Sequence, residues 1–250
     1  MENKTGRYIL YAIGEIVLVV IGILIALGIN NWNEEQKLAK ERITILENLR
    51  GDLTNDIENY QYSIQRLEDR QKVADQVLAL FDNIPKTIDS AKTARNLLVL
   101  GFIEDHNPNF STYNEIQWSG KLALINSKKL KTALANYKST VDNFKIIGSN
   151  WNEDIKDYER IVSGYFKGDI QQQFLPMDAT EVSQNRFLRF DLDEMSKNSD
   201  LISRIRHIAY FTKMEINIKK YGIIPLCNRI TKDIDAVLAS ETIEIQKSQH

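Results

Sequence analysis

The hydrophobic and polar positions of the chain divide it near the N-terminus. Residues 8–29, YILYAIGEIVLVVIGILIALGI, are apolar on every helical face apart from Glu15. As a helix this run would span about 33 Å, close to the thickness of a bilayer core. We therefore predict a transmembrane helix over 8–29, preceded by a short arm at 1–7. A cleaved signal peptide is the competing interpretation, but the run is longer than the usual signal core, and Glu15 interrupts it.

One face of this predicted helix collects its unusual residues. A carboxylate inside a bilayer is costly unless it is neutral or paired, and small residues three or four positions apart let two helices approach closely. The interpretation that we favour is a self-association face, in which a protonated Glu15 bonds across to a second copy. A proton or ion path is the alternative. The face consists of Ala12, Glu15, Val19, Gly22 and Ala26.

A second apolar pattern follows the predicted span without any Gly or Pro that would break the helix. We expect a long helix over about 32–83, continuous with the membrane helix and ending before Pro85, and then a shorter one over about 88–102. The narrow seam resembles that of a coiled coil. Its residues are Leu46, Leu49, Leu53, Ile57, Tyr60, Ile64 and Leu67.

The most regular pattern lies in the second half of the chain and predicts a helix over about 127–167. Its apolar residues alternate in steps of four and three, and Gly148 is the one member that is not bulky. Such a stripe indicates a packing surface for neighbouring helices. The stripe is Leu130, Leu134, Tyr137, Val141, Phe144, Gly148, Trp151, Ile155, Tyr158, Val162 and Tyr165.

A last long helix is predicted over about 201–245, with a kink at Pro225. The resulting fold class is all-α: one N-terminal transmembrane helix that continues into a long-helix antiparallel bundle over 30–250. Whether the bundle closes within one chain or needs a second copy stays open, although the narrow seam and the small-residue face favour a homo-oligomer. The irregular region 104–126 is our candidate partner loop, with Asn109, Phe110, Tyr113 and Trp118 as its contact residues.

Composition and motifs exclude several functional classes. The formal net charge is −2, so the chain lacks the basic surplus of a general nucleic-acid-binding protein. Its single cysteine, Cys227, rules out an internal disulfide and is expected to be an inert buried thiol. No nucleotide, hydrolase or metalloprotease motif is present, and neither Glu104-Asp105-His106 nor Asp191, Asp193 and Glu194 has metal-ligand spacing. We predict no enzyme activity, no cofactor and no metal.

Two blocks of the sequence carry a family resemblance. They are GRYILYAIGEIVLVVIGILIALGINNWNEEQ, with its Gly14-Glu15 pair and Asn30–Asn33 exit, and FSTYNEIQWSGKLALINSKKLKTALANYK, residues 110–138. Both resemble an uncharacterised family of membrane-anchored proteins in Gram-negative bacteria, a domain of unknown function. The resemblance implies a location and an architecture and no activity.

Location and function follow as hypotheses. Lys4 and Arg7 favour an N-terminus in the cytoplasm, which would place a single-pass protein in the bacterial inner membrane with its soluble domain in the periplasm. The leading hypothesis is a membrane-anchored scaffold or sensor that binds an unidentified protein partner or ligand, in contact with the lipid bilayer. The alternatives are an ion- or proton-coupled membrane subunit that uses Glu15, and a cryptic enzyme whose acidic or histidine side chains converge in a pocket.

Overall fold

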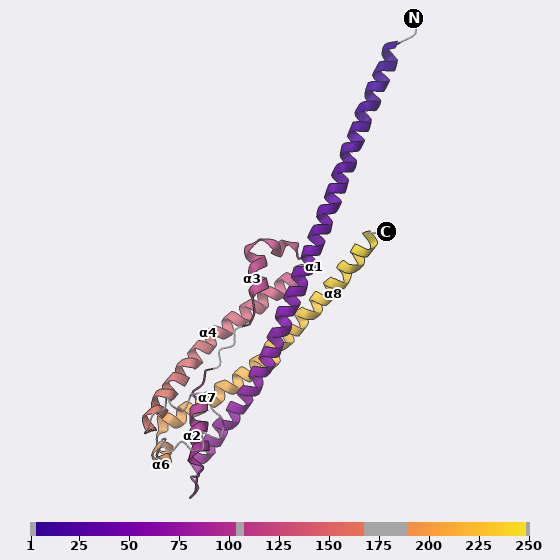
Figure 1. The fold of residues 1–250 in the computed structure, drawn as a ribbon. Coiled ribbons are helices and arrows are strands. Elements are labelled where there is room, and N and C mark those ends of the chain that lie inside the picture. Colours follow the sequence, from indigo (N-terminus) through magenta and orange to yellow (C-terminus); the bar gives the residue numbers. More distant parts are fainter. Residues whose placement is uncertain (1–3, 104–107, 168–189, 249–250) are drawn as a thin grey trace.

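The protein is all-α in its computed structural model, which describes residues 4–103, 108–167 and 190–248 (Figure 1). Every regular element in those ranges is a helix. In chain order they are α1 Lys4–Asp82, α2 Ser90–Val99, α3 Ser111–Trp118, η1 Lys121–Leu124, α4 Lys128–Tyr165, α6 Leu192–Ser196, α7 Ser199–Asn217, η3 Ile218–Ile223 and α8 Ile224–Ser248.

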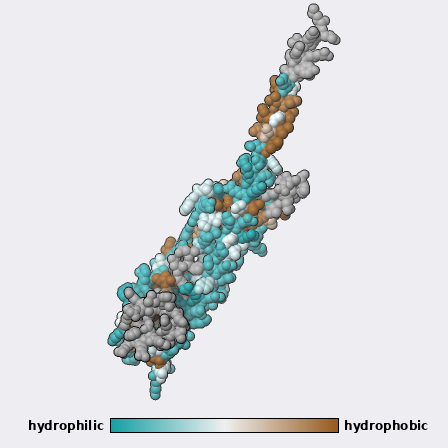
Figure 2. Space-filling model, in the orientation of Figure 1, coloured by the Kyte–Doolittle hydropathy of each residue, from teal (hydrophilic) through white to brown (hydrophobic). Residues whose placement is uncertain are grey.

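Helix α1 dominates the shape of the molecule. Its 79 residues form an unbroken rod of about 120 Å. The apolar part that begins at Ile13 lies beyond the bundle, and no residue of its most apolar window is buried. Figure 2 shows this part as a hydrophobic band above a largely hydrophilic bundle. Among the described residues, α1 is the one helix that is both long enough and apolar enough to cross a membrane.

The rest of α1 packs against α7 and α8, which together return antiparallel to it (Figure 1). Helix α4 runs in the same direction as α1, because the chain first returns along the bundle between α2 and α3 (Figure 1). Leu100 after α2 belongs to one end of the bundle, and Phe110 before α3 packs at the other. The antiparallel bundle predicted from sequence therefore also contains one parallel pair of long helices.

Two separate hydrophobic cores hold the bundle together, and each is built from a single chain. The proximal core, nearer the apolar segment, joins α1, α3, α4 and α8 through residues such as Leu46, Leu53, Tyr137 and Ile230. The distal core joins α1, α2, α4, α6 and α7 through residues such as Val77, Leu97, Tyr158 and Ile205. The seam of α1 is thus filled within one chain, and a homo-oligomer stays a prediction.

Local chemistry explains where the helices begin and end. Side-chain oxygens of Asp89, Ser127 and Asn198 accept hydrogen bonds from the first free N–H groups of α2, α4 and α7. Pro225 cannot donate to a carbonyl in the preceding turn and its ring crowds that carbonyl. A kink was expected at Pro225, and the structure has the π-helical segment η3 just before it, which widens the helix without ending it.

Candidate functional site in the polar middle of the bundle

One heptad column on α1 carries three of the buried polar side chains of the bundle. Arg42, Leu49, Asp56, Ser63, Arg70 and Val77 follow one another every seven residues, so they occupy one line along the helix. Asp56, Ser63 and Arg70 are buried despite their polarity. A buried polar group needs a hydrogen-bonding partner. Each polar residue of this column has such a partner on another helix or loop.

Asp56 anchors the polar groups of the proximal core. Its Oδ2 accepts a hydrogen bond from the Tyr137 hydroxyl at 2.7 Å, and its Oδ1 accepts one from the backbone N–H of Asn109 at 2.8 Å. The first bond ties α1 to α4, and the second ties α1 to the segment that leads into α3. A carboxylate at 2% exposure therefore fixes the register of three segments at one point.

The groups around Asp56 are held in their neutral forms. Burial is the main cause that raises the pKa of the Tyr60 and Tyr137 hydroxyls, and the negative charge of Asp56 raises that of Tyr60 further. Burial also raises the pKa of the Cys227 thiol from 9.0 to about 12. Cys227 is thus a buried thiol that stays protonated at neutral pH, which makes it a poor nucleophile.

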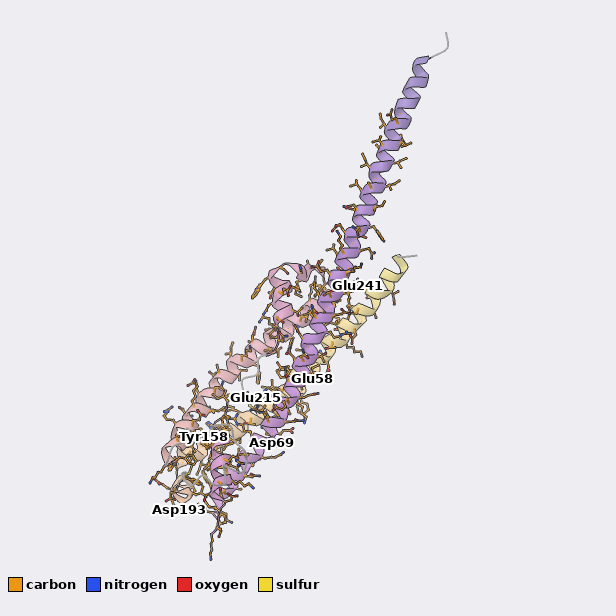
Figure 3. The ribbon with its side chains drawn as sticks, viewed as in Figure 1. Glu58, Asp69, Tyr158, Asp193, Glu215 and Glu241 are labelled. Carbon is orange, nitrogen blue, oxygen red and sulfur yellow. The ribbon has the colours of Figure 1, made fainter. Side chains whose placement is uncertain are left out.

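A second polar group lies midway along the bundle, where η3 meets α1. The ammonium of Lys219, at 1% exposure, donates to the Ser63 hydroxyl at 2.7 Å and forms an ion pair with Glu215. The guanidinium of Arg70 donates to the carbonyl oxygen of Leu100 at 3.0 Å. Figure 3 shows Glu215 between Glu241, near the apolar end, and Asp193, near the other end.

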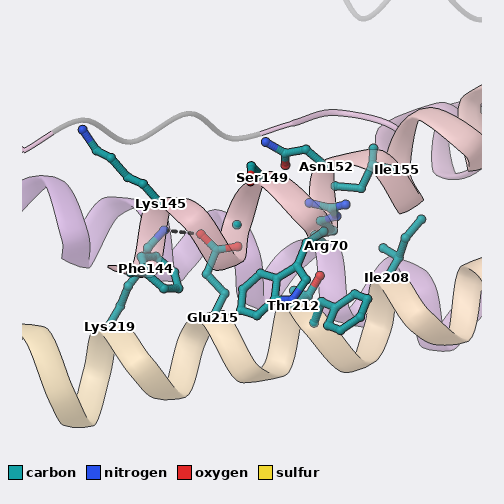
Figure 4. A pocket seen from close by; sticks show the side chains of 13 residues that line it. Arg70, Phe144, Lys145, Ser149, Asn152, Ile155, Ile208, Thr212, Glu215 and Lys219 are labelled. Atoms are coloured by element: carbon teal, nitrogen blue, oxygen red, sulfur yellow. Dashed lines mark hydrogen bonds and ion pairs between the residues drawn. The ribbon is translucent and has the colours of Figure 1, made fainter. Parts of the chain in front are cut away.

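A cavity of about 220 Å³ opens beside these charges, between α1, α4 and α7–η3. It lies where the stripe of α4 has Gly148 in place of a bulky residue. Its walls combine stacked aromatic rings, with Trp151 and Phe211 centroids 5.2 Å apart, and three basic side chains with one carboxylate (Figure 4). We call it the waist cavity; it is lined by Arg70, Phe144, Lys145, Gly148, Ser149, Trp151, Asn152, Ile155, Ile208, Phe211, Thr212, Glu215 and Lys219.

The four residues of the candidate partner loop fall into different environments. Tyr113 is buried in the proximal core, and Phe110 packs against that core with its ring 5.2 Å from Tyr137. The amide of Asn109 donates to Asp52 at 2.8 Å. Asn109 is exposed as well, and Trp118 is presented to solvent at 84% exposure with no core contact. Three of these side chains thus have structural contacts, and the proposed recognition role rests on Trp118.

The predicted self-association face lies on the part of α1 outside the bundle. Glu15, Val19, Gly22 and Ala26 are all exposed, and the side chain of Ala12 is outside the described residues. A single chain leaves the face uncovered, so its role in self-association stays a prediction. An ion path would need several copies of Glu15 around one axis, and one chain supplies only one.

The remaining sequence candidates contribute no metal centre to the part of the chain that the structure describes. No group of three or more His, Cys, Asp or Glu side chains is placed there to hold an ion. Asp191 caps α6 by accepting from the backbone of Glu194, and Asp193 pairs with Lys197. Glu104, Asp105 and His106 lie outside the described residues.

Sequence reasoning missed the buried polar groups because it followed only the apolar positions. The signal was present: Asp56, Ser63 and Arg70 stand seven residues apart on the face that carries the seam. Core positions of a heptad are normally apolar, so a charged residue there needs a hydrogen-bonding partner. Lys219 and Glu215, four residues apart on α7–η3, offered a weaker version of the same signal.

Comparison with known proteins gives one family match. Residues 15–150 match the model of a family described as "Family of unknown function (DUF6090)". The matched range contains all of the second block noted above and most of the first. No curated protein and no solved structure matches the chain.

Proposed function

The chain belongs to this family of unknown function, and from that premise we propose that it is a membrane-anchored helical sensor or scaffold. The apolar part of α1 would cross the bacterial inner membrane, and the bundle would stand in the periplasm. A ligand or protein partner bound by the bundle would shift α1, and the shift would reach the membrane segment.

The observation that carries this proposal is the continuity of α1. The same helix contributes Ile45 and Leu53 to the proximal core, Val77 to the distal core, and the whole exposed apolar segment. A continuous helix resists bending, so a displacement at the bundle is transmitted along its axis. A flexible linker at the membrane exit would have favoured a passive tether instead.

Contacts between α1 and α8 support the same role, because they fix α1 where it leaves the bundle. Arg42 on α1 pairs with Glu241 on α8 at 2.8 Å, and both side chains are largely buried. Glu41 on α1 also pairs with Lys121 of η1 at 2.7 Å, and Ala39 is still buried. These contacts hold α1 close to where the apolar segment begins.

Topology is the first test of the proposal. Reporter fusions at Asn33 and at the C-terminus would be compared in a bacterial host, with one reporter active only in the cytoplasm and one only outside it. We expect both fusions to report a position outside the cytoplasm. A cytoplasmic bundle would contradict the envelope role and would leave a scaffold facing cytoplasmic partners.

Rigidity of α1 is the second test. Spin labels at Leu27 and Glu58, both exposed, should lie about 45 Å apart along a straight helix and give one narrow distance distribution in nanodiscs. Replacing Asn33, Glu34 and Glu35 with glycine should broaden it, because glycine weakens the helix at these exposed positions. An equally broad distribution in the unmodified chain would rule out transmission through α1.

A further inference from the structure

We infer that the waist cavity is a binding site for a small organic anion, a planar aromatic carboxylate in its simplest form. This inference rests on the proposed function in one respect: the bound anion acts as a signal only if the protein is a sensor. It names the chemical class of the ligand and the residues that would recognise it. Binding of the anion can be measured on the purified protein, whether or not the protein is a sensor.

The charge of the cavity selects an anion. Arg70 and Lys219 line it as cations that are almost wholly buried, and Glu215 is the one carboxylate among its described lining residues. Buried charges act through a low dielectric, so a surplus of positive charge attracts an anion more strongly there than at the surface. Arg70 carries N–H donors in a planar fork, and its guanidinium donates to the Leu100 carbonyl. That fork suits a planar carboxylate.

The shape and walls of the cavity select an aromatic body. Trp151 and Phe211 stack with an interplanar angle of 15°, and Phe144 meets Trp151 edge-on. A cavity of about 150 Å³ is large enough for benzene, and this one measures about 220 Å³. A ring could lie against Trp151 while its carboxylate reaches the cations.

The sequence creates this space at a single position. Gly148 interrupts an otherwise bulky stripe, and a Cβ placed there would meet nothing within 4 Å. Packing alone would favour a larger residue, since native interiors leave few voids larger than a water molecule. Glycine in a helix interior also lowers helix stability relative to alanine. The glycine keeps the cavity open at a cost to the fold.

The binding test uses the full chain in nanodiscs, with Trp32→Phe and Trp118→Phe so that Trp151 is the remaining fluorophore. The probes are benzoate, neutral benzamide and cationic benzylamine, which share one ring and differ in charge. We expect saturable benzoate binding with a dissociation constant of about a millimolar or tighter. Benzamide should bind about tenfold more weakly, and benzylamine should not bind. Equal affinity for the three probes, or no saturable change, would overturn the inference.

Three substitutions test the location of the site. Two should weaken or abolish benzoate binding, and the third should strengthen it. Gly148→Leu should abolish benzoate binding by filling the cavity, while Gly164→Leu on the exposed side of the same helix should leave it unchanged. Arg70→Gln should weaken binding about tenfold. Glu215→Gln should tighten it several-fold, because the neutral amide no longer competes with the ligand for Lys219. Weaker binding in Glu215→Gln would contradict recognition by charge, whatever happens to Arg70→Gln.

The outcomes separate this inference from the proposed function. Benzoate binding without any change in the distance between a label at Leu27 on α1 and one at Asn136 on α4, both exposed, would support the site and remove the sensor role. A rigid α1 in a chain that binds none of the probes would overturn the site and leave the scaffold role intact.

Discussion

The two cores of the bundle solve the same packing problem with different chemistry. Both place a fully buried tyrosine of α4 against α1 or α2, and the two tyrosines lie three heptads apart. In the proximal core the Tyr137 hydroxyl donates to the carboxylate of Asp56 at 2.7 Å. In the distal core the Tyr158 hydroxyl donates to the neutral backbone carbonyl of Leu97 at 2.6 Å. The proximal core thus contains a charge, and the distal tyrosine is held by the backbone.

The difference concerns specificity more than stability. A buried carboxylate can be satisfied in only one register of the helices, whereas apolar side chains tolerate small sliding movements. The charged point lies in the half of the bundle that faces the apolar segment. There the axial position of α1 matters most for any signal that α1 would carry.

The largest expected effect comes from removing the charge in the proximal core. Asp56→Ala should lower the free energy of unfolding by about 3 kcal/mol, because it leaves the Tyr137 hydroxyl and the Asn109 N–H without their acceptor. The measurement is urea denaturation of the chain in detergent. Glu58→Ala, exposed on the same helix (Figure 3), is the control and should change stability by less than about 0.5 kcal/mol. Equal effects of the two substitutions would mean that Asp56 does not anchor the core.

Removing each tyrosine hydroxyl in turn should lower the free energy of unfolding by less than Asp56→Ala does, and by different amounts in the two cores. Tyr137→Phe should cost about 2 kcal/mol, because its hydrogen bond has a charged acceptor. Tyr158→Phe should cost about 1 kcal/mol, since its acceptor is a neutral carbonyl. Both variants keep the ring, so the packing term cancels when they are compared by denaturation. A larger loss at Tyr158 would reverse the comparison between the cores.

The fold was largely predictable because apolar periodicity records burial directly. The stripe of α4 places Leu130, Tyr137 and Tyr158 in the two cores, and the seam of α1 is buried as its spacing indicates. The parallel direction of α1 and α4 could not be predicted. It depends on the return of the chain after Leu100, where no periodic pattern reveals the path.

The site was harder to predict, because it consists of departures from the apolar pattern. Gly148 is a gap in a stripe, and Arg70 and Lys219 are charges at buried positions. Each alone has an ordinary explanation as a surface residue or a weak spot in a helix. Only the packing of three helices brings them together around one space.

Alkaline pH should act on the proximal core through its thiol. The folded pKa of Cys227, about 12, lies above the ordinary value of 9.0. Below pH 9 the thiol is protonated in both states and its stabilising contribution is complete. As pH rises from 9 towards 12 the unfolded state loses the proton first, so stability falls. The expected loss is about 1.4 kcal/mol by pH 10.

The measurement for this prediction is denaturation between pH 8 and pH 10. Cys227→Ala should lose less stability over the same interval, because it has no thiol to titrate. Glu58→Ala, which removes neither a thiol nor a buried hydroxyl, should keep the full decline. Parallel curves for Cys227→Ala and the unmodified chain would exclude the thiol as the cause.

The smallest expected change in stability comes from a substitution between the two cores, and it is an increase. Gly148→Ala should raise stability by about 0.5–1 kcal/mol, because alanine favours the helix and its Cβ meets nothing within 4 Å. Gly51→Ala, at an exposed position inside α1 where an added Cβ also meets nothing within 4 Å, should give a similar gain, and the measurement for both is thermal unfolding. At Gly101, next to the distal core, an added Cβ would lie 2.6 Å from Cγ of Glu159, so Gly101→Ala should destabilise. If Gly148→Ala also destabilised, the middle of the bundle would be as tightly packed as the two cores. The comparison of two cores separated by a loose, polar middle would then fail.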